Sequence, residues 1–222
     1  MQIDIHGSKP RLGLFSGIHG DEWRIISSVK RTIVNYQDDL GSYVYIPKCS
    51  PSAVNSKTRT NEEGNDLNRT FIKNPQDQEA KEIISLIKPF TFDLCVDFHE
   101  DTDLNSVYVY DSANIEGSTE LAKFRNQVLK ITTLYSGVDD ETDEQLGGKS
   151  HEGYRVSNPP EKDENGNYEY LGFFDYWALI EKKTKRWMTL ELPIGLPEAK
   201  KDKIVDIFFS TLILPLGTNH TP

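Results

Sequence analysis

The sequence has little cysteine and no long apolar run, and both absences narrow the class of protein. Its two cysteines, Cys49 and Cys95, match neither the spacing of a zinc cluster nor a disulfide framework. No apolar stretch approaches the roughly 20 residues that a membrane-spanning helix needs. The first residues, MQIDIHGSKP, lack a basic region followed by an apolar stretch, so no signal peptide is visible. We expect a cytoplasmic protein, although a mature secreted chain would show the same features.

Positive charge is also scarce, since 25 Lys and Arg against 35 Asp and Glu give a formal net charge of −10. A chain this acidic is not expected to bind nucleic acid or an anionic membrane through its overall field. A local basic pocket for an anionic substrate remains compatible with this charge. The 222 residues suffice for one large domain or two small ones, with a sizeable core, and they contain neither an internal repeat nor a low-complexity tract.

Strand-like and helix-like segments alternate along the chain. Strands are expected at 12–16, 42–46, 92–98, 106–110, 131–135 and 186–190, and helices at 22–36, 76–87, 115–129, 171–182 and 197–214. Residues 47–68 and 136–168 look irregular, and the second stretch is long enough to be a functional loop. The alternation predicts an α/β fold whose parallel strands collect ligands at their carboxyl ends.

His19 and Glu22, in the stretch SGIHGDEW, stand where an expected strand gives way to an expected helix. Side chains at i and i+3 share one face of a helical turn, so this imidazole and carboxylate can bind one small cation. An ordinary helix start gives the same pattern, with Asp21 and Glu22 near the positive end of the helix dipole.

His99, in the stretch VDFHEDTD, ends the apolar run 92–98. A strand end is a rigid mount for a third ligand, and Asp97 would point to the same side of the strand. Asp97 can then accept a hydrogen bond from His99 and fix its tautomer. Two His and one Glu are the donors of a hydrolytic zinc site, in which water takes the fourth position. A histidine in a solvated strand end is the alternative.

Asn68 and Arg69 lie in the turn-rich segment NDLNRTF, and Arg59 stands ten residues before Arg69. An adjacent amide and guanidinium can hold a carboxylate. Arg59 can face a carbonyl oxygen under attack and stabilise its developing charge. Each arginine can instead be a surface residue paired with a nearby acid such as Asp66.

Glu191 lies near the end of an expected strand in WMTLELP. A carboxylate at the mouth of a sheet, close to a metal site, is placed to act as a general base. An edge-facing residue before the turn at Pro193 is the alternative.

Taken together, HGDE, DLNRTF, DFHE and TLELP resemble the zinc metallocarboxypeptidase superfamily, in this order and over residues 11–195. Within it, HGDE and DLNR look most like the succinylglutamate desuccinylase and aspartoacylase branch. The resemblance implies a three-layer α/β/α sandwich around a mixed, mainly parallel eight-stranded sheet. It also implies that His19, Glu22 and His99 bind one catalytic Zn²⁺.

The resemblance implies roles for further residues. Arg59 would polarise the scissile carbonyl, and Glu191 would be the general base. Asn68 and Arg69 match the pair that binds a substrate carboxylate.

Peptidases of this group also carry a tyrosine on a mobile loop before the final strand. Tyr168 and Tyr170 lie at about the right distance, and Tyr154 is a weaker candidate. Phe173, Phe174 and Asp175 match a region that lines the specificity pocket, where Phe would favour an apolar substrate side chain. Aromatic core packing is the alternative for the two phenylalanines.

Enzymes of the desuccinylase and aspartoacylase branch carry an extra C-terminal β-rich domain, but only 31 residues follow Glu191 here. We therefore expect residues 1–222 to form a single catalytic domain with an open cleft. The expected function is zinc-dependent hydrolysis of an amide bond next to a free carboxylate in a small peptide. The alternative is deacylation of an N-acyl amino acid, and a non-catalytic metal-binding protein on the same fold is a remote third.

Overall fold

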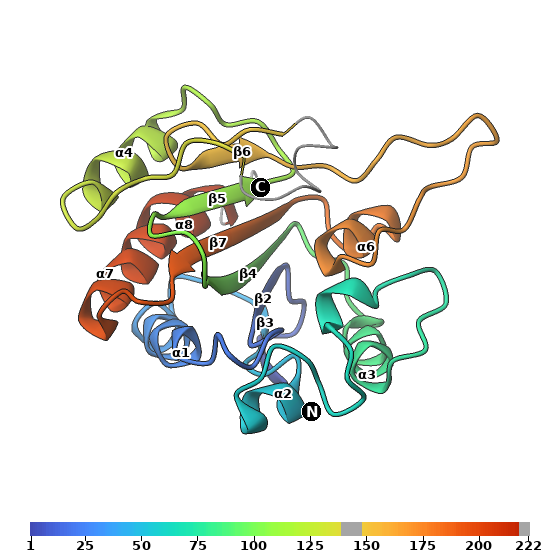
Figure 1. The fold of residues 1–222 in the computed structure, drawn as a ribbon. Helices are drawn as coiled ribbons and strands as arrows, with labels where there is room; N and C mark the ends of the chain where they lie inside the picture. Colours follow the sequence, from blue (N-terminus) through green and yellow to red (C-terminus); the bar gives the residue numbers. More distant parts are fainter. Residues whose placement is uncertain (139–147, 218–222) are drawn as a thin grey trace.

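One mixed sheet forms the centre of the computed structural model, which describes residues 1–138 and 148–217. Its strand order is β1-β3-β2-β4-β7-β5-β6 (Figure 1). The strands are β1 Asp4–His6, β2 Leu12–Ser16, β3 Tyr43–Ile46, β4 Leu94–Asp101, β5 Tyr108–Asp111, β6 Tyr154–Val156 and β7 Trp187–Pro193. The central strands β3, β2, β4 and β7 run parallel, whereas β1 and β5 run antiparallel to their neighbours β3 and β7.

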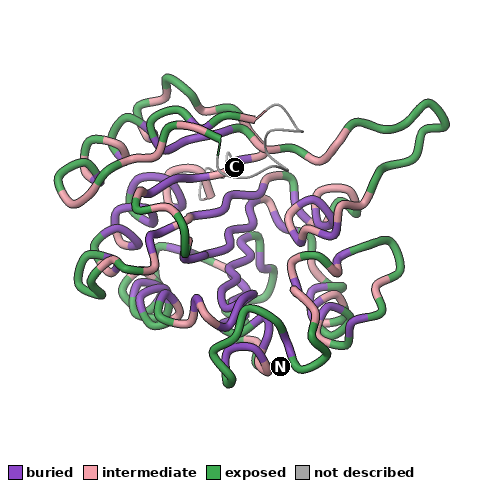
Figure 2. The backbone as a smooth tube through the Cα atoms, in the orientation of Figure 1, coloured by how far each residue is buried: buried purple, intermediate pink, exposed green. Residues whose placement is uncertain are grey.

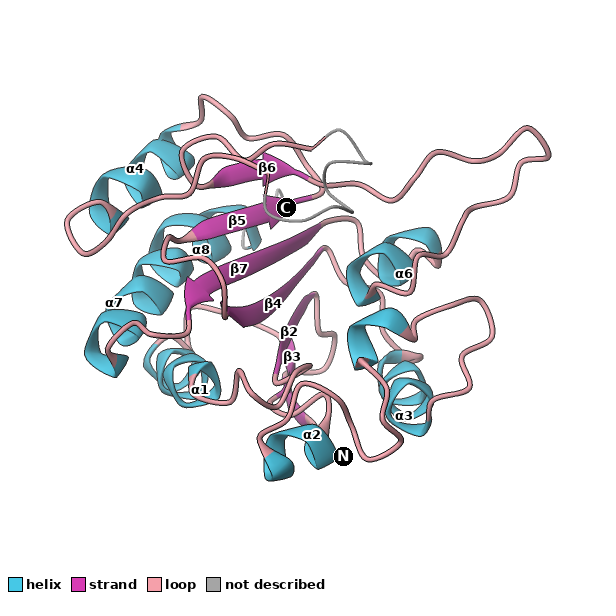
Figure 3. Cartoon of the chain, in the orientation of Figure 1, coloured by secondary structure: helices cyan, strands magenta, loops and turns pink. Residues whose placement is uncertain are grey.

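Helices cover both faces of this sheet (Figure 3). They are α1 Ile25–Asn35, α2 Pro51–Ser56, η1 Leu67–Arg69, α3 Gln78–Ile87, α4 Thr119–Val128, α6 Phe174–Ile180, α7 Glu198–Phe208, η2 Phe209–Ile213 and α8 Leu214–Gly217. One face of the sheet packs against α1, α4, α7 and η2, and the other against α3 and α6. The central strands β2 and β3 are buried along their whole length, whereas the edge strand β1 is exposed (Figure 2). No helix within 1–138 or 148–217 is long and apolar enough to cross a membrane.

This architecture confirms the predicted α/β/α class, and the described residues form seven strands where the resemblance implied eight. Residues 131–135 form no strand, because only Leu134 makes a bridge there, to Val107. The stretch 47–68, expected to be irregular, contains α2. Of the stretch 136–168, residues 139–147 lie outside the described part, and β6 belongs to the remainder.

Side-chain caps explain where several helices begin. The Asp77 carboxylate accepts the backbone N–H of Ala80 at the start of α3, and the Ser118 hydroxyl accepts that of Leu121 at the start of α4. The helix expected from residue 22 begins at Ile25 instead. Its first N–H donates to the Glu100 carboxylate on β4, at 3.1 Å. The His19–Glu22 segment is therefore a turn that precedes the helix.

A buried ion pair connects α7 to β4. Glu100 and Lys201 are each 1% exposed, and the Lys201 ammonium contacts the Glu100 carboxylate directly. The same ammonium donates to the carbonyl oxygen of Ile194, at 2.7 Å. Burying two charges is favourable only while both are paired and hydrogen-bonded, so this contact links α7, β4 and the start of α1.

Lys201→Met should destabilise the protein by about 3–5 kcal/mol, because it leaves the Glu100 carboxylate buried without its partner. Urea unfolding at pH 7 measures the loss. Lys203→Met is the matched control, since Lys203 is exposed on the same helix. A loss in Lys201→Met no larger than in the control would contradict the prediction.

The loss of stability in Lys201→Met should also depend on pH. Burial already raises the pKa of Glu100 above its ordinary value of 4.5, against the opposing effect of Lys201. A carboxyl whose pKa is higher in the folded state binds more protons there, so its contribution to stability falls as the pH rises above 4.5. Removing Lys201 raises this pKa further. Unfolding of Lys201→Met should therefore show a larger deficit at pH 8 than at pH 5.

Candidate metal centre and active site

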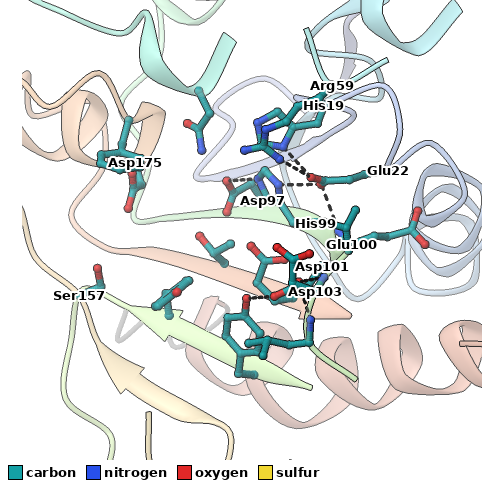
Figure 4. Close-up of a pocket in the computed structure, with 18 of the residues that line it drawn as sticks. His19, Glu22, Arg59, Asp97, His99, Glu100, Asp101, Asp103, Ser157 and Asp175 are labelled. Atoms are coloured by element: carbon teal, nitrogen blue, oxygen red, sulfur yellow. Dashed lines mark hydrogen bonds and ion pairs between the residues drawn. The ribbon is translucent and has the colours of Figure 1, made fainter. Parts of the chain in front are cut away.

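The structure brings the three predicted metal ligands together at the carboxyl ends of the central strands (Figure 4). The ligand atoms of His19, Glu22 and His99 all lie within 4.8 Å of one another. Nδ1 of His19 is 2.6 Å from one Glu22 carboxylate oxygen, and Nδ1 of His99 is 2.8 Å from the other. All three side chains are buried. The group can therefore surround one cation.

The Nε2 atoms of both imidazoles contact carboxylates, an arrangement that is typical of histidines that bind a metal through their other nitrogen. Nε2 of His19 lies 3.0 Å from Asp66, and Nε2 of His99 lies 3.1 Å from Asp97. Such partners fix the ring orientation and leave Nδ1 to face the metal. Two nitrogens and one carboxylate form a donor set that suits a tetrahedral divalent ion with an open position.

The ring nitrogens of this cluster are also proton sites. Burial would lower the pKa of His99, but the charges of Glu22, Glu191 and Asp97 raise it well above its ordinary value. Burial would raise the pKa of Glu22, but both imidazoles hold it well below its usual range. A metal ion competes with the protons on Nδ1, so metal affinity is expected to weaken as the pH falls.

The turn that carries His19 and Glu22 packs tightly on α2. The N–H of Gly20 donates to the carbonyl oxygen of Thr58, at 2.9 Å. A Cβ atom added to Gly20 would lie 1.9 Å from the carbonyl oxygen of Ala53, where no side chain fits. The glycine of HGDE is therefore required by a close backbone approach between two distant segments.

Two rows of side chains on β4, β7 and β5 line the cavity beside these donors. The rows are Asp97, Thr189 and Tyr110, and His99, Glu191 and Tyr108. Side chains opposite each other on neighbouring strands point to the same face, so Glu191 lies beside His99. Burial raises the pKa of Glu191 well above its ordinary value. The charge of Glu22 raises this pKa further, whereas the charge of His99 lowers it.

Arg59 borders the metal donors from the opposite side. Its guanidinium contacts the Asp66 carboxylate at 3.0 Å and lies 3.7 Å from a Glu22 oxygen. Asp66 therefore supports both Arg59 and His19. Burial would raise the pKa of Asp66, but its contacts with these two residues hold it well below its usual range. Arg59 therefore pairs with Asp66, as one prediction had it, and also lines the cavity.

Asn68 and Arg69 line the same cavity. The backbone N–H of Phe174 donates to Oδ1 of Asn68, at 3.0 Å. Because a backbone N–H can only donate, this contact leaves the NH₂ end of the amide for an acceptor. The Arg69 guanidinium stacks on the Phe173 ring, 4.3 Å from its centroid. Both side chains are thus oriented by the segment that begins α6.

The two predicted loop tyrosines do not line this cavity. The hydroxyl of Tyr170 donates to the Glu181 carboxylate, and Tyr168 is 39% exposed beside Lys162. The weaker candidate, Tyr154, is buried and donates to Asp111. Their assignment to the substrate remains a prediction that this geometry does not support.

Three other tyrosines line the cavity instead, and no role was predicted for them: Tyr108, Tyr110 and Tyr176. The alternation of YVY in β5 could have indicated that Tyr108 and Tyr110 share a face. Phe174 is fully buried and stacks on Phe71, so core packing explains it, whereas its neighbour Phe173 lines the cavity.

The catalytic-domain model of the succinylglutamate desuccinylase/aspartoacylase family matches residues 8–136. This range is more than half of the chain and contains all three candidate metal donors as well as Arg59. The chain therefore belongs to the succinylglutamate desuccinylase/aspartoacylase catalytic-domain family, which is a family of hydrolases. A comparison with curated protein sequences found no match.

Solved structures of metallopeptidase type share the fold. A provisionally assigned metallopeptidase from Shewanella baltica OS155 has a TM-score of 0.74 at 16% identity, over 97% of this chain and 81% of its own. A Pseudomonas aeruginosa metallo-carboxypeptidase in complex with (2-guanidinoethylmercapto)succinic acid gives 0.61 at 16%, over 95% and 58%. A succinylglutamate desuccinylase from Silicibacter sp. TM1040 gives 0.57 at 17%, over 97% and 60%. At these identities the similarity establishes the fold alone.

Trp187→Phe should weaken metal binding about 10-fold. The indole N–H of Trp187 donates to Oδ1 of Asp97 at 2.9 Å, and Asp97 in turn orients His99. Loss of such an outer partner typically costs 10- to 100-fold in affinity. Competition with a chromophoric chelator at pH 7.5 measures the dissociation constant for Zn²⁺.

Trp177→Phe is the control for packing, because Trp177 is a buried member of the same aromatic cluster. It should reduce stability without a change in metal affinity. Equal dissociation constants for Trp187→Phe and the wild type would show that Asp97 does not need this donor.

Proposed function

We propose that the chain is a zinc-dependent hydrolase that cleaves an amide bond next to a substrate carboxylate, in the manner of a metallocarboxypeptidase. The observation that carries the proposal is the convergence of His19, Glu22 and His99 on one point, with Glu191 on the neighbouring strand. A Zn²⁺ bound there would acidify a water molecule and polarise the scissile carbonyl. The proposed catalytic domain spans the chain.

Glu191 is the proposed general base. It takes a proton from the attacking water and passes it to the nitrogen of the leaving amine. A carboxylate with a raised pKa is a stronger base than an ordinary one, and burial among other acids raises the pKa of Glu191. Arg59, beside the donors, stabilises the negative charge that develops on the carbonyl oxygen.

Asn68 and Arg69 are the proposed binding residues for the substrate carboxylate. The NH₂ end of Asn68 and the guanidinium of Arg69 are donors that line the same cavity. A carboxylate held there fixes which amide bond reaches the reacting groups. The ligand of the P. aeruginosa structure is a succinic acid derivative, which agrees with a carboxylate-bearing substrate.

Deacylation of an N-acyl amino acid is the second candidate, and the family match favours it. Both reactions use the same hydrolytic groups. Release of amino acids from blocked dipeptides, compared with release of amine from N-succinyl-glutamate or N-acetyl-aspartate, separates the two. The higher kcat/KM identifies the reaction.

Glu191→Gln should lower kcat by about 10²- to 10⁴-fold on the better of these substrates, because it removes the proton acceptor. The zinc content should stay unchanged. Glu169→Gln, which neutralises an exposed acid outside the cavity, should retain the wild-type rate. Hydrolysis by Glu191→Gln at the wild-type rate would show that the assigned base is wrong.

The purified protein should contain about one Zn²⁺ per chain, and His99→Ala should contain almost none after dialysis, because it lacks one of three ligands. Elemental analysis measures both. His151→Ala changes an exposed histidine away from the cluster and should keep its metal. A native protein that folds and hydrolyses its substrate without metal would overturn the assignment.

A further inference from the structure

One buried cation of the structure has no part in the proposed reaction. Lys201 on α7 is 1% exposed and lies outside the lining of the cavity. Burying an ammonium costs free energy unless it is paired and hydrogen-bonded. The Lys201 ammonium pairs with Glu100 on β4 and donates to the carbonyl oxygen of Ile194, at 2.7 Å. Its two partners lead to different parts of the candidate site.

Glu100 connects Lys201 to the candidate metal donors. It follows His99 directly on β4, and its side chain points away from the His99 imidazole (Figure 4). The backbone N–H of Glu100 donates to the Glu22 carboxylate, at 3.1 Å. Its own carboxylate accepts the N–H of Ile25, three residues after Glu22. The orientation of Glu100 therefore determines how the turn that carries Glu22 meets β4.

Ile194 connects the same ammonium to the strand of the proposed base. It follows β7 directly, three residues after Glu191. Its N–H donates to the carbonyl oxygen of Asp101 at the end of β4, at 2.8 Å. In the register of these two strands His99 lies opposite Glu191. The ammonium thus contacts, at one point, a residue of β4 and the residue at the end of β7.

The other polar contacts of this part of α7 do not make the same connection. Asp202 binds the Ser28 hydroxyl and the Arg31 guanidinium, so it joins α7 to α1 rather than to β4 or β7. The Arg31 side chain is 51% exposed, and a pair in such a position contributes little. The buried contact of Lys201 is therefore not duplicated by its neighbour.

We propose that Lys201 is a positioning residue, which fixes the candidate metal donors and the proposed base relative to one another from the far face of the sheet. This inference rests on the proposed function and adds a residue to the same site. Lys201 acts through Glu100 and Ile194 rather than on the substrate. A misplacement of about 1 Å between reacting groups can lower a rate about 10²-fold. Loss of the ammonium should therefore impair the site beyond its effect on stability.

Binding of Zn²⁺ tests the proposal without catalysis. Lys201→Met should weaken it about 10-fold, the lower end of the range for loss of an outer partner of a metal ligand. Competition with a chromophoric chelator measures the dissociation constant. Circular dichroism and a thermal midpoint define a temperature at which each variant is folded.

Ile204→Ala is the matched control for stability. Ile204 is fully buried on the same helix, so its truncation leaves a cavity and destabilises the protein to a similar degree. This variant should nevertheless bind Zn²⁺ as the wild type does. An equal loss of affinity in Ile204→Ala and Lys201→Met would show that the site responds to core packing in general, and the proposal would fail.

Lys201→Arg tests whether a cation at this position restores the site. A guanidinium presents several donors in a fixed fork, which can serve both the Glu100 carboxylate and the Ile194 carbonyl oxygen. Lys201→Arg should therefore bind Zn²⁺ more tightly than Lys201→Met. An affinity no higher than that of Lys201→Met contradicts the role assigned to the cation.

The imidazole signals of the metal-free protein report the positions of the donors directly. Both rings contact carboxylates through Nδ1 and Nε2, so a displaced ring changes the ¹⁵N shifts of these atoms. In a long-range ¹H–¹⁵N spectrum, Lys201→Met should shift the signals of His19 and His99, whereas Ile204→Ala should leave them at the wild-type positions. Unchanged signals in Lys201→Met overturn the proposal.

Turnover separates this inference from the proposed function. On the better of the substrates named above, Lys201→Met should lower kcat about 10- to 100-fold with little change in KM. KM is spared because Asn68 and Arg69 are oriented by the segment that begins α6, not by α7. A wild-type kcat in Lys201→Met overturns the inference alone. If the wild type cleaves no substrate, the proposed function fails, and the imidazole signals still decide the role of Lys201.

Discussion

The arrangement of the site depends on the contacts that the Glu22 carboxylate makes. One oxygen binds the imidazole of His19, and the other binds the imidazole of His99 and the backbone N–H of Glu100. The first histidine comes from a turn and the second from β4, 80 residues further along the chain. A buried carboxylate is stable only when its hydrogen bonds are made, so these partners are held near one point.

Each of the two candidate histidine ligands is supported in turn by a carboxylate outside the donor group. Asp66 and Asp97 hold the outer nitrogens of the histidines, and both carboxylates are occupied by further donors, Arg59 and Trp187. Such layered support fixes ring orientation before any ligand arrives. The support is drawn from the loop before η1 and from β7, so parts of the chain remote in sequence determine the geometry of the donors.

The three candidate ligands could be named from the sequence because their signal is local. His99 ends an apolar run near the end of β4, and Glu22 stands three residues after His19, just beyond β2. The parallel arrangement of these two strands brings their carboxyl ends to one edge. The supporting contacts were not predictable, since Trp187 reaches Asp97 only through the pairing of β4 with β7. The predicted start of the first helix was wrong for a similar reason. Helix α1 begins at Ile25, whose N–H donates to the carboxylate of Glu100 on β4.

The two faces of β4 connect the candidate site to the buried core. Consecutive residues of a strand point to opposite faces, so His99 turns toward the cavity and Glu100 toward α1 and α7. The Glu100 carboxylate binds Lys201 and the first N–H of α1, while its backbone N–H binds Glu22. The buried ion pair therefore determines how the turn before α1 meets β4, and this turn carries the other two donors. It follows that the candidate metal donors take their positions from the packing of the core.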